Sequence, residues 1–150
     1  MAKYNVEHSC GHTVEYNLCG KGTERTRKLE WLATQDCPAC EKAARDAKHN
    51  AANAAAAQAN ASAGLPALQG SDKQIAWAET IRAGYMPGLQ AKLAEMQAKV
   101  TPENAAIAAQ AIGITESIIN NQSAAWWIDR RDHERADILL MNEFRAARNS

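Results

Sequence analysis

Residues 8–40, HSCGHTVEYNLCGKGTERTRKLEWLATQDCPAC, contain all four cysteines of the chain. Two close pairs of metal-ligating side chains lie near the ends of this stretch, Cys10-Gly11-His12 and Cys37-Pro38-Ala39-Cys40. Zinc prefers four sulfur or nitrogen ligands in a tetrahedron, and two pairs far apart in sequence let one ion join two chain segments. Cys-Pro-x-Cys also forms a tight turn whose amides point at sulfur. The pattern predicts a structural zinc site built from Cys10, His12, Cys37 and Cys40.

The fourth ligand of this site is the least determined. Cys-x-His is a less common pair than Cys-x-x-Cys, so His8 or Cys19 is an alternative to His12. Disulfides are an alternative to metal, but a reducing cytosol favours metal ligation for Cys and His at short spacings. With four protein ligands no position remains for an activated water, which argues against zinc catalysis.

The segments around the two pairs indicate a small module. Residues 3–7 and 13–18 alternate apolar and polar side chains, which predicts a β-hairpin whose tip carries the first pair. Residues 23–32 can form a helix, and the second pair then begins another helix. We expect this zinc-binding module to occupy residues 1–43.

An alanine-rich segment follows the module. From Glu41 to Ala63 the only apolar side chain is alanine, and a helix of this kind has no wide apolar stripe to bury. We therefore expect a connecting helix or a mobile linker over residues 44–70. The glycines and proline of residues 64–70 mark the boundary with the next module.

A helical bundle is expected over residues 71–150. Ser71-Asp72-Lys73-Gln74 is a capping box, in which Ser71 and Gln74 each bond the other's backbone amide. Apolar side chains follow at helical spacing. Gly84 and Pro87 should kink or divide this first helix.

Two further helices complete the expected bundle. Thr101-Pro102-Glu103 should begin the second, and Asn120-Asn121 should end it. Ser123 should cap a last helix that contains both Trp126 and Phe144. Because short connections favour antiparallel neighbours, the predicted fold is mainly α, with a zinc-knuckle β-hairpin module followed by an antiparallel three-helix bundle.

Composition excludes several classes of protein. Lys plus Arg equals Asp plus Glu, 17 each in 150 residues, which fits neither a basic nucleic-acid clamp nor an acidic DNA mimic. The sequence has neither a run of membrane-spanning length nor the apolar core of a signal peptide, so we expect a cytoplasmic protein. It also lacks a recognisable phosphate loop or catalytic triad, so we expect no enzyme.

Two stretches combine aromatic and basic residues. Arg25, Arg27 and Lys28 beside Trp31 could contact phosphate, although Glu24 and Glu30 dilute their charge. The second stretch is predicted to bind a partner protein, because Trp and Arg are enriched at binding hot spots; its residues are Trp126, Trp127, Arg130 and Arg131. The alternative is that both tryptophans are core residues and the charges pair with each other.

Residues 70–82, GSDKQIAWAETIR, followed by Trp126-Trp127-Ile128-Asp129, resemble a recurrent group of small bacterial proteins from prophages and other mobile elements. In this group a Cys/His zinc knuckle precedes a stretch similar to Gly-Ser-Glu-Lys-Gln-Ile-x-Trp-Ala-Glu. The segment from Gly84 to Gly88 departs from an otherwise continuous helix.

In size and architecture the chain also resembles small metal-binding anti-CRISPR proteins of mobile elements. This resemblance implies a zinc-containing inhibitor that binds the type II CRISPR effector nuclease stoichiometrically in the bacterial host cell. The alternative is a zinc-knuckle nucleic-acid-binding or regulatory protein of the same element.

Overall fold

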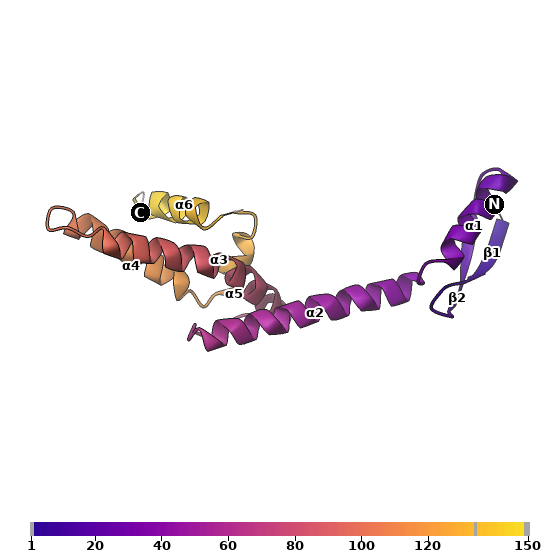
Figure 1. The fold of residues 1–150 in the computed structure, drawn as a ribbon, viewed down its shortest axis with the longest axis horizontal. Coiled ribbons are helices and arrows are strands. Elements are labelled where there is room, and N and C mark those ends of the chain that lie inside the picture. Colours follow the sequence, from indigo (N-terminus) through magenta and orange to yellow (C-terminus); the bar gives the residue numbers. More distant parts are fainter. Residues whose placement is uncertain (1, 134, 149–150) are drawn as a thin grey trace. The chain divides into compact units, whose positions relative to one another are not determined.

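The computed structural model describes residues 2–133 and 135–148. The chain divides into two compact units, residues 1–49 and residues 50–150, which are described separately. The division falls within the alanine-rich segment, and residues 50–70 group with the helices that follow. As expected, the protein is mainly α with a small β-hairpin at its N-terminus (Figure 1).

The first unit contains an antiparallel hairpin and two helical segments. Strands β1 (Ala2–Glu7) and β2 (Thr13–Leu18) pair in a register that sets Val6 opposite Val14. Gly11 has a positive φ of 78° at the hairpin tip, a conformation that favours glycine. Helix α1 (Gly22–Ala33) contacts β1 and buries Leu32. Val6 of β1 and Leu32 of α1 are the buried aliphatic side chains of these elements among the described residues.

Helix α2 (Pro38–Ser62) continues through the alanine-rich segment. Its residues 41–52 are all exposed, which agrees with a segment that has only alanine to bury. Near its end, however, Asn60 is buried and donates hydrogen bonds to Glu79 Oε2 at 2.5 Å and to the Glu79 carbonyl at 3.0 Å. The last turns of α2 therefore belong to the second unit, where Asn60 contacts Glu79 of the following long helix.

The second unit is built around helix α3 (Asp72–Ala98), which contacts α4 (Ala105–Ile119), α5 (Ala124–Asp129) and α6 (Ala136–Arg148) (Figure 1). Its core is a single cluster of buried apolar side chains, including Leu68, Ala78, Tyr85, Met86, Leu89, Ile118, Ala124, Trp127, Leu139 and Leu140. Burial of these side chains is the main force that holds the helices together. None of the described helices is both long enough and apolar enough to cross a membrane.

Of the predicted kink or division of the first bundle helix at Gly84 and Pro87, the division is wrong, because α3 passes through both residues. Proline removes one helical hydrogen bond, but Met86 before Pro87 and Leu89 after it are buried in the core, and this packing maintains the helix. Gly88 allows α6 to approach closely, since a Cβ at this position would lie 2.7 Å from the Cβ of Ala136.

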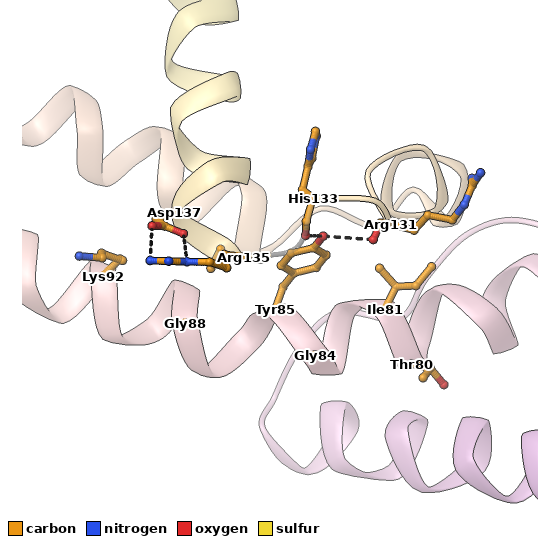
Figure 2. Close-up of a pocket in the computed structure, with 11 residues that line it drawn as sticks. Thr80, Ile81, Gly84, Tyr85, Gly88, Lys92, Arg131, His133, Arg135 and Asp137 are labelled. Carbon is orange, nitrogen blue, oxygen red and sulfur yellow. Dashed lines mark hydrogen bonds and ion pairs between the residues drawn. The ribbon is translucent and has the colours of Figure 1, made fainter.

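The expected last helix is also divided, into α5 and α6. The Tyr85 hydroxyl on α3 shares its proton among three carbonyls of the connecting segment, those of Arg130 and of Arg131 and His133 (Figure 2). These carbonyls are consequently bonded to α3 instead of to a helix of their own. The residues around them are polar, so a continuous helix here would have no apolar side chain to bury. Burial raises the pKa of Tyr85, so its hydroxyl stays protonated as a donor.

The second bundle helix begins later than predicted, at Ala105. Thr101-Pro102-Glu103 lies in a turn, because Asn104 Oδ1 accepts from the Thr101 amide at 2.8 Å and its Nδ2 donates to the Lys99 carbonyl at 2.9 Å. The predicted end is confirmed, since α4 stops at Ile119 and Asn120 is its C-cap.

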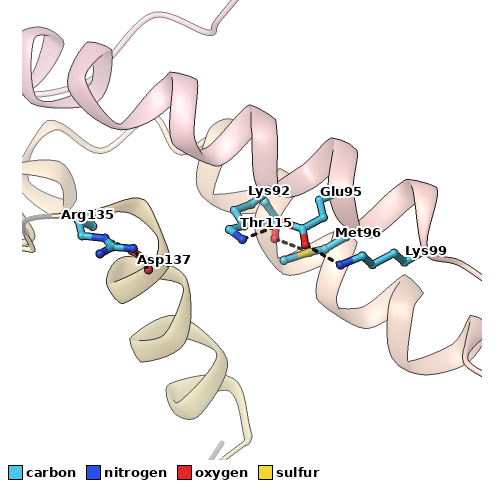
Figure 3. Close-up of polar contacts among 7 residues, drawn as sticks. All are labelled: Lys92, Glu95, Met96, Lys99, Thr115, Arg135 and Asp137. Carbon is cyan, nitrogen blue, oxygen red and sulfur yellow. Dashed lines mark hydrogen bonds and ion pairs between the residues drawn. The ribbon is translucent and has the colours of Figure 1, made fainter.

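Surface charges on the second unit are largely paired along α3 and at the start of α6. Glu95 bridges Lys92 at 2.8 Å and Lys99 at 2.6 Å, and Arg135 pairs with Asp137 at 2.7 Å (Figure 3). Exposed pairs of this kind contribute little to stability.

Candidate metal centre

The structure brings Cys10, His12, Cys37 and Cys40 together, with their ligand atoms all within 4.8 Å of one another. Cys10 and His12 come from the hairpin tip, and Cys37 and Cys40 from the start of α2. These four residues can hold a metal ion. Cys37 is buried, Cys10 and Cys40 are half-buried, and His12 is exposed, so one edge of the cluster faces solvent.

Two sulfur–nitrogen distances within the cluster are close to those of a tetrahedral zinc site. A zinc tetrahedron with bonds of about 2.3 Å to sulfur and about 2.0 Å to nitrogen has S–N edges of roughly 3.5 Å. His12 Nδ1 lies 3.2 Å from Cys40 Sγ and 3.8 Å from Cys37 Sγ, on either side of that value. Nδ1 is therefore the histidine nitrogen that faces the sulfur atoms.

Backbone amides also point at the sulfur atoms. The Cys40 amide donates to Cys37 Sγ at 3.4 Å, which confirms the tight turn predicted for Cys-Pro-x-Cys. The Cys37 amide donates to Cys10 Sγ at 3.3 Å, and this bond, followed by one from the His12 backbone, lowers the pKa of Cys10 to about 6. The neighbouring Cys37 and Cys10 thiols raise the pKa of Cys40 to about 12. Negative charge is thus concentrated on Cys10, and a bound dication would ionise all three thiols.

The two alternative ligands do not belong to the cluster. His8 is 3% exposed, and both of its ring nitrogens have other partners. Its Nδ1 lies 3.0 Å from the Gln35 carbonyl, which can only accept, so Nε2 accepts from the Tyr16 hydroxyl at 3.0 Å. Cys19 is exposed and lies outside the group of ligand atoms. His12 is therefore the fourth member.

The basic-aromatic residues of α1 lie on the surface of the first unit. Trp31 is 52% exposed, and the Lys28 ammonium lies 4.3 Å from its ring centroid. Both residues, with Arg27 and Glu24, line a cavity of about 390 Å³. This surface is available for contact.

The four residues predicted to bind a partner occupy different environments. Trp127 is fully buried and donates from Nε1 to the Asn121 carbonyl at 3.0 Å. Trp126 packs edge-on against it, while Arg130 covers the Trp126 ring at 4.0 Å and pairs with Glu143 at 2.6 Å. Trp127 is consequently a core residue, and Trp126 and Arg130 already have partners within the chain.

Arg131 is the exposed member of the four, and it lies 5.5 Å from the ring centroid of Trp77. Trp77 is 47% exposed but was not among the residues singled out from the sequence. The available signal was its place in the 70–82 motif, where it stands beside the buried Ala78 on α3.

Comparisons with protein-family models, curated proteins and solved structures find no match to this chain.

Proposed function

We propose that the cluster binds one zinc ion and that the ion stabilises the fold of the first unit. Three thiol sulfurs and an imidazole are the ligands zinc prefers, and a set of four is typical of structural sites. The ion would join the hairpin tip to the start of α2. Since the hydrophobic core of this unit contains only a few buried side chains, its folding free energy should depend on the metal.

We further propose that the protein acts by stoichiometric binding to another protein. The observation that carries this proposal is that each unit has a half-exposed tryptophan beside a cation, Trp31 with Lys28 and Trp77 with Arg131. Tryptophan and arginine are enriched at binding hot spots, and a cation over an exposed ring leaves that ring accessible to a partner at its edge and other face. A ligand set of four protein side chains argues against metal catalysis. A formal net charge of zero argues against DNA mimicry.

The proposed partner is the RNA-guided type II CRISPR effector nuclease of a bacterial host, and this choice is supported by the resemblance in size and architecture to small metal-binding anti-CRISPR proteins. The test is co-purification of the zinc-loaded protein with that nuclease, together with a cleavage assay. We expect a defined complex and inhibition that saturates near one inhibitor per nuclease. Inhibition far below one per nuclease would indicate catalysis instead, and absence of a complex would refute this partner.

A second candidate function is binding to single-stranded nucleic acid through α1. Trp31 could stack on a base while Arg27 and Lys28 contact phosphates, as is usual for such surfaces. This candidate predicts a gel shift with free DNA or RNA that weakens steeply with salt. A shift of this kind that is lost on Trp31→Ala, without a nuclease complex, would favour it over the docking proposal.

A further inference from the structure

A cavity of about 610 Å³ lies beside the metal cluster in the first unit. Its apolar walls include Tyr16 from β2, Trp31 and Leu32 from α1, and Pro38 from α2. This volume is within the usual range for a binding pocket. Ser9 and Asp36, the neighbours of the ligands Cys10 and Cys37, also line it, so the same segments shape the metal site and the cavity.

Hydrogen bonds hold these walls in place. The buried His8 ring bonds Tyr16 on one side and the Gln35 carbonyl on the other, both at 3.0 Å. The Ser9 hydroxyl donates to Asp36 Oδ1 at 2.7 Å, and the Ser9 amide donates to the Gln35 carbonyl at 3.1 Å. A preformed cavity loses little conformational entropy when it is filled, which favours binding.

Among the described residues, the charged side chains that line the cavity are all acidic. Asp36 and Glu41 contribute carboxylates, whereas the lining contains neither lysine nor arginine among the described residues. Asp36 accepts from a neutral hydroxyl, and Glu41 pairs only with Arg45 in an exposed contact at 3.2 Å. Lys28 contacts Trp31 but lines the other cavity. Because an exposed pair such as Glu41–Arg45 is weak, Asp36 and Glu41 can both bind a cation that enters.

We propose that this cavity accepts an arginine side chain of the partner protein, with its guanidinium bound to Asp36 and Glu41 and its stem against Trp31 and Tyr16. Arginine fits this lining because its planar guanidinium stacks on aromatic rings and bonds carboxylates bidentately. The inference rests on the proposed docking function and assigns part of the surface that docks. It needs no covalent step and no change of protonation.

The direct test is titration of the zinc-loaded full-length protein with the peptide Ac-Gly-Arg-Gly-NH2, followed by ¹H–¹⁵N NMR. We expect saturable shifts of the Trp31 indole and of the Ser9 and Gln35 amides, with a dissociation constant on the order of 1 mM, as a single side chain provides. The matched peptide with citrulline, which is isosteric but uncharged, should give no saturable shifts. Equal binding of both peptides would overturn the proposal, as would tighter binding of spermidine.

Substitutions test whether the arginine peptide binds in this cavity or elsewhere on the surface. Asp36→Asn keeps an oxygen that can accept from Ser9 but removes the charge, so we expect about fivefold weaker arginine-peptide binding. Glu41→Gln is the second variant if Asp36→Asn loses zinc, with the same expectation. Glu30→Gln removes an exposed carboxylate of α1 that does not line the cavity and should bind like the parent protein. Equal affinity of all variants would overturn the assignment.

The same variants distinguish this inference from the proposed function. If the nuclease complex forms and Asp36→Asn and Glu41→Gln bind as tightly as Glu30→Gln, the cavity assignment fails and the docking function stands. If the arginine peptide binds as expected but the nuclease does not co-purify, the proposed partner fails and the cavity assignment stands.

Discussion

The backbone amide of Cys37 donates a hydrogen bond to Cys10 Sγ across the two ligand pairs, at 3.3 Å. This bond joins the start of α2 to the hairpin tip without the ion. It also lowers the pKa of Cys10.

We expect the purified protein to contain one zinc ion per chain. Because metal binding and folding of a small module are coupled, Cys37→Ser should lose zinc and unfold residues 1–40, while the helices of the second unit stay folded. Elemental analysis and ¹H–¹⁵N spectra measure both effects. Cys19→Ser is the matched control and should keep its zinc. Full zinc content in Cys37→Ser would contradict the assigned ligand set.

Limited proteolysis should cut α2 in its exposed first half. Lys42, Arg45 and Lys48 are exposed, and backbone that buries no side chain opens locally at low cost. Trypsin should therefore release a stable fragment that begins near residue 49 and retains the buried Asn60. Mass spectrometry of the early products identifies the sites. First cuts after residue 60 would show that the end of α2 is not packed on α3.

The buried pair of Glu79 and Arg82 should be sensitive to loss of either charge. Arg82 is 1% exposed and donates to Glu79 Oε2 at 2.8 Å and to the Pro66 carbonyl at 2.7 Å. Glu79→Gln leaves the guanidinium buried without its counter-charge, so the free energy of unfolding should fall by about 3 kcal/mol. Urea unfolding measures it. Glu95→Gln on the exposed side of α3 should have a much smaller effect.

Glu95 should titrate far below an ordinary glutamate. Its hydrogen bonds with Lys92 and then Lys99 lower its pKa from 4.5 to about 2. The pKa of Glu95 is lower in the folded chain than in the unfolded chain. Ionised Glu95 therefore stabilises the fold at pH values above its unfolded pKa, and this contribution is lost as the pH falls toward its folded pKa. The carboxyl ¹³C shift measures the midpoint. A midpoint near that of a free glutamate would contradict the bridge between the two lysines.

Two glycines of α3 should respond to alanine in opposite directions. A Cβ at Gly84 would meet no atom within 4 Å, so Gly84→Ala should stabilise the protein by about 0.5–1 kcal/mol through helix propensity. A Cβ at Gly88 would lie 2.7 Å from the Cβ of Ala136, so Gly88→Ala should displace α6 and lower the midpoint of thermal unfolding. Equal effects of the two substitutions would argue against the α3–α6 contact.

Local signals determined much of this protein from its sequence alone. The capping box is formed, with the Ser71 amide donating to Gln74 Oε1 at 3.0 Å and the Gln74 amide donating to Ser71 Oγ at 3.4 Å. Ser123 caps α5 as predicted. The tight turn of Cys37-Pro38-Ala39-Cys40 is also formed, with the Cys40 amide donating to Cys37 Sγ at 3.4 Å. Such features depend on residues within a few positions of each other, and their spacing is visible in the sequence.

Contacts between distant residues decided the rest. The sequence predicts His12 as a ligand but leaves His8 as an alternative, whereas in the fold Gln35 and Tyr16 engage both nitrogens of His8. The division of the last helix depends on the Tyr85 hydroxyl, 45 residues from its carbonyl acceptor at Arg130. Burial of Trp127 likewise follows from the packing of α5 against α3. Only the folded chain sets these distances, because each requires two segments whose sequences carry no sign of one another.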